Sequence, residues 1–138
     1  MPYGKYNNPE IYNEKIIMLA SELLYNVIIQ DQSYERILSK IEKGDFVYLD
    51  PCYDPLKRTS FASYTPKRFS FSDREKLFGF MKSVRLKEAS PMLSNNNLPI
   101  IRGDYEREGF KINFVSAARS VNCNGLGRGK IQELLITS

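Results

Sequence analysis

An aspartate, a proline and a tyrosine stand close together directly after an apolar run in the stretch YLDPCYDPL, residues 48–56. Proline restricts the backbone and has no N–H group to donate. The carboxylate of Asp50 and the carbonyl of Pro51 can therefore point at one spot, where two acceptors suit an amino group with two hydrogens. Tyr53 can offer a flat face for stacking beside them. This combination would bind a flipped-out base that carries an exocyclic amine.

An Asp-Pro turn beside a tyrosine is also a common way for a chain to leave a strand. Residue types elsewhere narrow the possible chemistry, because the chain has no histidine and two cysteines, Cys52 and Cys123. Serine–histidine and cysteine–histidine hydrolysis are thereby excluded. Neither a disulfide framework nor a metal site of the structural zinc type is expected. Any chemistry must use carboxylates, amides, hydroxyls and backbone groups.

Length and charge set broad limits. A chain of 138 residues suits one domain with a single core. The net charge of +4 permits binding to nucleic acid but does not demonstrate it. No apolar run approaches the roughly 20 residues of a membrane span, and no leader typical of secretion opens the chain. The expectation is a cytoplasmic protein that does not bind membranes.

Periodicity indicates the elements that must position these residues. Asn8-Pro9-Glu10 is typical of a helix start, and apolar residues recur at helical spacing from Ile16 to Val27. The β-branched run Val27–Ile29 predicts a buried strand, and a second helix is expected from Ser33 to about Ile41. The run Phe46–Leu49 is apolar at every position, which favours a strand covered on both faces, as in parallel α/β sheets.

The second half continues the alternation of helices and strands. Residues 50–71 form a long loop, after which Ser72-Asp73-Arg74-Glu75 has the form of a capping box. Alternating strands and helices indicate an α/β fold, and the last two strands, with no helix between them, are expected to pair antiparallel. The remaining predicted elements are a strand from Pro91 that ends at Ser94–Asn97, a helix from Pro99 to Gly109, and strands over Lys111–Ser116 and Lys130–Thr137.

The tetrapeptide Asp50–Tyr53 resembles the Asp-Pro-Pro-Tyr motif of the Dam-like N6-adenine-specific DNA methyltransferases, and the likeness continues in order along the chain. The beginning, PYGKYNNP, is similar to the end of that family's DNA-reading region. The other similar stretches are GDFVYLDPCYDPL, TSFASYTPKRFSFSDREKL, MLSNNN and AARSVNCNGLGRGKIQELLITS.

The resemblance implies a partial Rossmann-like methyltransferase sheet, mostly parallel, with an antiparallel closing hairpin. It also implies methyl transfer from S-adenosyl-L-methionine to the exocyclic amine of an adenine flipped out of double-stranded DNA. Asp50 and the carbonyl of Pro51 would hold the amine, and Tyr53 would stack on the base. The amine would attack the methyl group directly, which requires no covalent enzyme intermediate.

Further site residues follow from the same resemblance. Ser33 and Tyr34, with Asp50, match positions beside the cofactor, although a plain helix start explains Ser33 equally well. For the DNA-contacting positions, the alternatives are a hydrophobic loop anchor and scattered solvated cations. These positions are Lys5, Tyr6, Phe61, Tyr64, Arg119, Asn122 and Arg128.

Part of the family pattern is missing from this sequence. No stretch similar to the glycine-rich cofactor loop Phe-x-Gly-x-Gly occurs, and Cys52 replaces the second proline of the motif. The resemblance therefore implies that residues 1–8 are a remnant of the DNA-recognition region and residues 9–138 the carboxyl-terminal part of the catalytic domain. The family's first two strands, which lie between the Val27 and Phe46 strands, would be absent.

The absent strands would leave an apolar, unpaired edge on the Phe46 strand. We expect one of three consequences: assembly with a separate amino-terminal methyltransferase chain, self-association, or marginal stability. A catalytically inactive remnant, acting at most as a DNA-binding or interaction module, is the alternative function. A small RNA-binding α/β domain is a third hypothesis.

Overall fold

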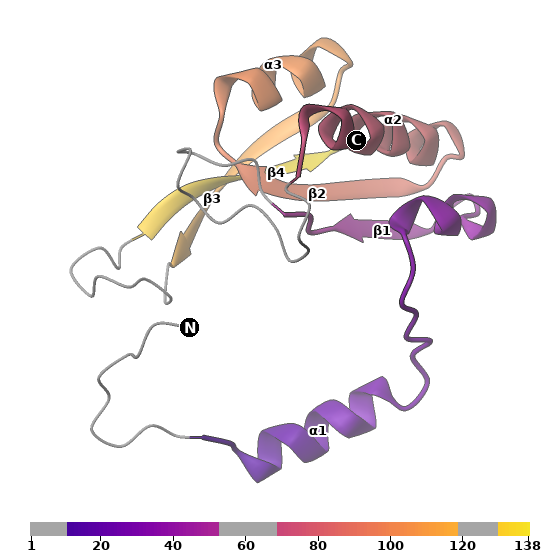
Figure 1. Ribbon diagram of the computed structural model, residues 1–138, viewed down its shortest axis with the longest axis vertical. Helices are drawn as coiled ribbons and strands as arrows, with labels where there is room; N and C mark the ends of the chain where they lie inside the picture. The colour runs from indigo at the N-terminus through magenta and orange to yellow at the C-terminus, as the bar shows by residue number, and fades with distance from the viewer. Residues whose placement is uncertain (1–10, 53–68, 119–129) are drawn as a thin grey trace.

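A four-stranded sheet forms the centre of the computed structural model, which describes residues 11–52, 69–118 and 130–138 (Figure 1). Within these ranges no helix has the length and apolar character needed to cross a membrane. In chain order the elements are α1 (Glu14–Leu24), the 3₁₀ helix η1 (Tyr34–Lys40), β1 (Phe46–Leu49), α2 (Phe71–Leu86), β2 (Ser90–Asn96), α3 (Pro99–Arg107), β3 (Lys111–Ala118) and β4 (Lys130–Thr137).

The strand order is β1-β2-β4-β3. β1 and β2 are parallel, whereas β4 pairs antiparallel with both β2 and β3. The predicted α/β class and the antiparallel closing pair are confirmed. The prediction of a mostly parallel sheet is wrong for the described residues, because only one of their three strand pairings is parallel.

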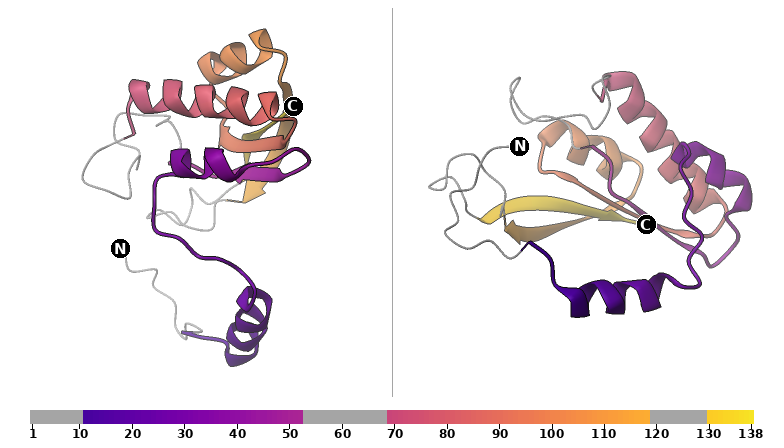
Figure 2. Two further views of the ribbon diagram at one scale, coloured as in Figure 1. Left: turned by 90° about the vertical axis from the view of Figure 1, so that its right-hand side faces the viewer. Right: turned by 60° about the horizontal axis from the view of Figure 1, so that its bottom comes forward.

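Helices α2 and α3 cover one face of this sheet, as the two turned views also show (Figure 2). Val47 and Leu49 of β1 point to that face together with Leu93 of β2, and each is buried. They pack with Met81 and Val84 of α2 in the core. The core therefore lies between the sheet and these two helices, and side chains of η1 pack against its margin.

Two predicted helix starts differ from the observed ones. The capping box of α2 uses Ser70 and Asp73, each side chain bonding the other residue's backbone N–H, rather than Ser72. The predicted box was two residues late because Ser70 and Asp73 have the same spacing of a hydroxyl and a carboxylate as Ser72 and Glu75. The cap of α1 is Asn13, whose side chain accepts from the Ile16 N–H; the predicted start at Asn8 lies outside the described residues.

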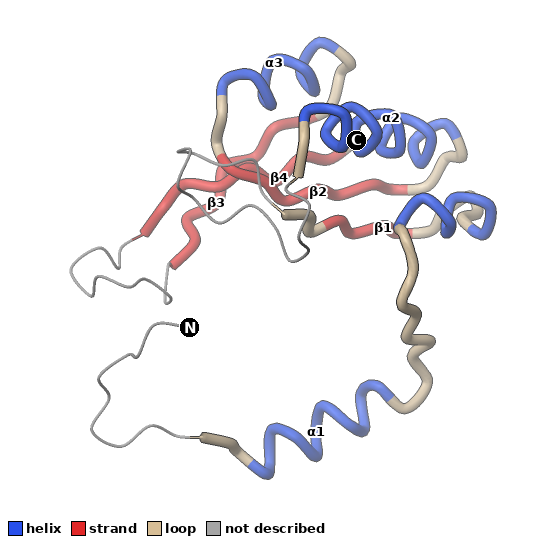
Figure 3. Tube along the Cα trace, in the orientation of Figure 1, coloured by secondary structure: helices blue, strands red, loops and turns tan. Residues whose placement is uncertain are grey.

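The predicted strand at Val27–Ile29 is not formed. These three side chains are 51%, 84% and 78% exposed, and the segment between α1 and η1 is an open loop (Figure 3). A strand needs a hydrogen-bonding neighbour, and none of the described strands lies beside this run. The β-branched composition was identified correctly, but the element requires a partner that the described residues do not supply.

Among the described strands β1 lies at the edge of the sheet, as predicted for Phe46–Leu49. The prediction that both of its faces are covered is wrong, because Phe46 and Tyr48 are 63% and 53% exposed. A continuous apolar run cannot distinguish a covered second face from one left bare. Here α2 packs on one face of the strand only.

Candidate functional site

Asp50 lies at the carboxyl end of β1, directly beside the end of the parallel strand β2. The register pairs Leu49 with Leu93, so the next residues along, Asp50 and Ser94, become neighbours. The Ser94 hydroxyl donates to Asp50 Oδ1 at 2.8 Å and lies 3.4 Å from the carbonyl oxygen of Leu49. A hydroxyl carries one proton, so Ser94 can donate one full hydrogen bond. The shorter contact, to Asp50, has the better length for it.

Burial differs sharply between the two partners. Ser94 is 6% exposed, whereas Asp50 is exposed. The second carboxylate oxygen of Asp50 has no hydrogen bond within the described residues. One oxygen is thus held by the protein while the other can accept a hydrogen from a ligand.

The rest of the tetrapeptide is described only in part. Pro51 and Cys52 are half-buried, and Cys52 is a free thiol. Tyr53 lies outside the described residues, so its predicted stacking role stays a prediction. The roles of Asp50 and Pro51 as acceptors for an amine likewise stay predictions.

Polar residues continue along the end of β2, where a strand interior is normally apolar. Asn95 and Asn96 are 2% and 6% exposed, and the Asn96 N–H donates to Asn95 Oδ1 at 2.8 Å. Asn97 donates its amide to Gln132 Oε1 on β4 at 2.8 Å, while its own Oδ1 is buried without a hydrogen bond in the described part of the chain. Buried polar groups usually have a partner, and within the described residues this oxygen is available to accept a hydrogen bond.

Sequence reasoning treated SNNN as the end of a strand and missed Ser94 as a site residue. The available signal was the polar run at the end of a strand expected to be parallel to the Phe46 strand. Parallel neighbours bring their carboxyl ends to one edge of the sheet, where ligands bind in open α/β sheets.

The proposed cofactor residues Ser33 and Tyr34 lie on a different element. Ser33 precedes η1, and its hydroxyl donates to Glu35 Oε2 at 2.9 Å. Tyr34 packs edge-on against Phe80 of α2, with ring centroids 5.0 Å apart. Burial raises the pKa of Tyr34, and Glu35 and Asp73 raise it further. The structure shows no hydrogen bond between these residues and Asp50, so their cofactor role stays a prediction.

The predicted DNA-contacting positions are not covered by the structural description. Lys5, Tyr6, Phe61, Tyr64, Arg119, Asn122 and Arg128 all lie outside the described residues. The described part does contain an open groove of about 320 Å³ between α2 and α3. Phe71, Phe78 and Ile100 line it, but Asp50 does not, so it is separate from the carboxylate site.

Comparisons with known proteins match the chain to one family. The family model of D12 class N6 adenine-specific DNA methyltransferases matches residues 1–121. The type II methyltransferase M1.LlaDCHI of Lactococcus lactis subsp. cremoris is 37% identical over 100% of this chain and 49% of its own length. For M.MjaIII of Methanocaldococcus jannaschii, the identity is 40% over 99% of this chain and 47% of the relative. The DNA adenine methylase of Serratia marcescens is 31% identical over 98% of this chain and 50% of its own length. The chain spans about half the length of these relatives.

Proposed function

Because the chain belongs to the D12 class of N6 adenine-specific DNA methyltransferases, we propose that it forms the adenine-binding part of a DNA adenine methyltransferase. The reaction is transfer of a methyl group from S-adenosyl-L-methionine to the exocyclic amine of adenine in DNA. The relatives M1.LlaDCHI and M.MjaIII are named as type II methyltransferases. This chain aligns with about half the length of each of them.

The observation that carries the proposal is the exposed Asp50 carboxylate, held through one oxygen by buried Ser94 at the end of two parallel strands. A fixed acceptor of this kind can bind one amine hydrogen, and the carbonyl of Pro51 can bind the other. As the nitrogen attacks the methyl group it gains positive charge, which a carboxylate and a carbonyl oxygen stabilise. Tyr53 would complete the site by stacking on the base.

The residues present fit only one side of the cofactor site. Asp50, with Ser33 and Tyr34 as further candidates, could contact S-adenosyl-L-methionine. The chain has no glycine-rich loop of the Phe-x-Gly-x-Gly kind to admit its methionine part. When bound, the cofactor supplies an electrophilic methyl group, and this chain orients the amine that receives it.

The substrate is double-stranded DNA with the target adenine flipped out of the stack. A flipped base reaches a pocket by unstacking, at a cost of a few kcal/mol, and stacking on Tyr53 would offset part of that cost. The net charge of +4 favours contact with phosphates. In this proposal residues 1–8 remain from the DNA-recognition region, and residues 9–138 form the carboxyl-terminal part of a Rossmann-like catalytic domain.

Cys52 favours a second candidate, a catalytically inactive remnant that still binds DNA or a protein. A second proline at this position would stiffen the turn after Asp50, whereas cysteine loosens it and adds an N–H group. Methyl transfer separates the two candidates, because the remnant would bind without turnover.

The test is incorporation of labelled methyl groups into long unmethylated DNA of mixed sequence. The chain is assayed alone and after co-expression with the unmatched half of M.MjaIII. We expect methylated adenine from the co-expressed protein, and a loss of at least a hundredfold in Asp50→Asn. Asp45→Asn, at the other end of β1, is the matched control and should retain activity. A co-purifying complex that transfers no methyl group would support the inactive remnant.

A further inference from the structure

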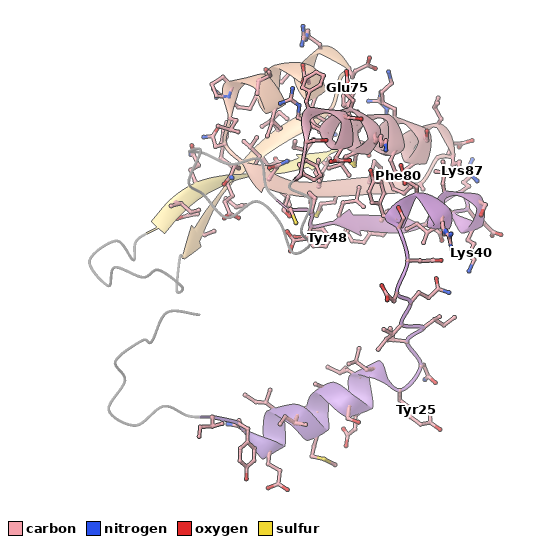
Figure 4. The ribbon with its side chains drawn as sticks, viewed as in Figure 1. Tyr25, Lys40, Tyr48, Glu75, Phe80 and Lys87 are labelled. Carbon is pink, nitrogen blue, oxygen red and sulfur yellow. The ribbon has the colours of Figure 1, made fainter. Side chains whose placement is uncertain are left out.

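The edge of β1 exposes an unusually apolar strand. Among the described residues β1 pairs only with β2, so its outer N–H and C=O groups have no strand partner. Phe46 and Tyr48 point away from α2, as the labelled Tyr48 shows in Figure 4. Edge strands are usually protected by charge, proline or a bulge. The sequence Phe-Val-Tyr-Leu has none of these features.

A second apolar surface precedes β1 in the chain. α1 has no buried residue, and it stands apart from the sheet on the side opposite α2 and α3 (Figures 1 and 2). Ile16, Leu19 and Leu23 are 64%, 50% and 80% exposed. The neighbouring run Val27–Ile29 has the composition of a strand but pairs with none of the described strands.

The exposed apolar groups are concentrated in one part of the chain. Among the described residues, fourteen of the nineteen exposed large hydrophobic side chains precede Asp50. The later elements, by contrast, bury their apolar faces between sheet and helices. Apolar side chains exposed in such number on neighbouring elements favour an interaction surface.

The exposed face of β1 also leads directly to the candidate site. Tyr48 pairs with Met92, and Ser94 lies two residues further along β2, so Tyr48 and Ser94 share one face of the sheet. A partner seated on this face beside β1 would therefore reach the end of the sheet where Asp50 is exposed.

We propose that the edge of β1 and the run Val27–Ile29 together bind the half of a D12 methyltransferase that the longer relatives have outside the region aligned with these residues. One strand of that half pairs with β1, and its apolar surface covers the exposed run Val27–Ile29. The choice of occupant rests on the proposed function and on length, since relatives aligned over 99–100% of this chain are about twice as long. Exposed Phe46 and Tyr48 pack against the incoming half.

A second copy of this chain fits the surface less well. Two β1 strands of four residues would pair over a short edge, and each copy brings a net charge of +4. Such pairing would leave both Val27–Ile29 runs exposed. Small contacts of this kind fall below the area of stable interfaces.

The test is co-expression of the full chain with the part of M.MjaIII that does not align with it. We expect a one-to-one complex by light scattering after size-exclusion chromatography. Hydrogen exchange should slow over Val27–Ile29 and Phe46–Leu49. Phe46→Lys should weaken the complex at least tenfold, because an aromatic contact is lost and a charge is buried. The control Phe71→Lys changes a phenylalanine of matched exposure, 62% against 63%, on α2, and it should leave the affinity unchanged.

Each outcome supports or overturns the proposal that the β1 edge and Val27–Ile29 bind the other half of the enzyme. Failure of the soluble half to bind, or binding that Phe46→Lys leaves intact, overturns the proposal. A dimer of this chain alone that Phe46→Lys dissociates also overturns it, because the occupant is then a second copy. A complex sensitive to Phe46→Lys supports the surface even where it transfers no methyl group, and the missing transfer then counts against the proposed function alone. The exchange measurement needs no variant, so it decides even where Phe46→Lys fails to fold.

Discussion

Ser94 is the residue that gives the Asp50 carboxylate a fixed direction. Its hydroxyl is buried and bonds one carboxylate oxygen at 2.8 Å. A hydrogen bond to a charged group is worth about 1.5–3 kcal/mol. Without it, an exposed aspartate at the end of a strand can sample several rotamers, and only some of them would hold an amine in line for attack.

We therefore expect Ser94→Ala to lower kcat of the assembled methyltransferase about tenfold, with little change in KM for DNA. Ser94→Thr keeps the hydroxyl on a strand-compatible side chain and should recover most of the rate. Steady-state methylation kinetics on both variants measure the effect. An alanine variant as fast as the parent, with Asp50 still required, would remove Ser94 from the site.

Tyr34 couples stability to alkaline pH. Burial raises its pKa above the ordinary value of 10.0, and Glu35 and Asp73 add to the shift. The folded state therefore favours the neutral phenol. This contribution is complete below the unfolded-state pKa and is lost as the pH rises through the folded-state pKa.

Tyr34→Phe keeps the ring that packs on Phe80 and removes the titrating group. The loss of unfolding free energy between about pH 9 and pH 11 should be smaller in this variant than in the parent. Urea unfolding followed by circular dichroism at each pH measures it. The control Tyr25→Phe, at an 87% exposed position, should lose stability as the parent does; an equal pH dependence in Tyr34→Phe would contradict the assignment.

Sequence reasoning named Asp50 as a candidate and did not name its partner Ser94, for a physical reason. Asp50 belongs to a short linear motif, so neighbours in the sequence reveal it. The contact with Ser94 joins residues that are 44 positions apart, and it depends on the register of β1 against β2. Periodicity predicts that a strand exists but does not predict which residues face one another across two strands.

At the level of elements, α2 and α3 end in the same hydrogen-bonded turn with different residues. The residue at the left-handed position is Gly109 after α3, with φ of 77°, and Glu88 after α2, with φ of 57°. In both turns the next residue, Phe110 or Ala89, donates to the carbonyl five positions earlier. Glycine adopts this conformation without steric cost, whereas glutamate is strained there by about 1 kcal/mol.

Exchanging the residue types should shift stability in opposite directions. Gly109→Ala should lower the free energy of unfolding by about 1 kcal/mol. Glu88→Gly should raise it by about 0.5 kcal/mol, because relief of strain exceeds the loss of an exposed ion pair with Lys43. Gly103→Ala is the control, since it lies inside α3 with open space for a methyl group, and it should be neutral or stabilising. Urea unfolding of the three variants tests the series; equal effects of Gly109→Ala and Gly103→Ala would contradict it.

Elements that depend on local signals were predicted well. Strand Lys130–Thr137 matches its prediction at both ends, and the helix opened by Pro99 ends at the predicted glycine turn. The prediction of a strand at Val27–Ile29 was wrong. The composition of this run is typical of a buried strand, but forming one requires a neighbouring strand in space. Phe46–Leu49 likewise formed a strand, but only one of its faces is covered.

At the scale of the whole molecule, stability is unevenly distributed. Leu134 and Ile136 of β4 are fully buried in the core of the sheet, so their amides should exchange only when the domain unfolds. α1 has eleven residues and buries none of them. Isolated helices shorter than about 12–15 residues are marginal in water, so the cap from Asn13 alone is not expected to hold α1 folded.

Hydrogen exchange of the chain alone should therefore show two classes of amide. Those of α1 should exchange within seconds at neutral pH, whereas those of β4 and of α2, which buries Met81 and Val84, should be protected for as long as the domain stays folded. Mass spectrometry of peptides from each element measures this, with α2 as the helical control for intrinsic rates. Protection of α1 equal to that of α2 would show that α1 packs against another surface in solution. Because its apolar side chains would then be buried without the missing half, such protection would also weaken the argument that this region awaits a partner.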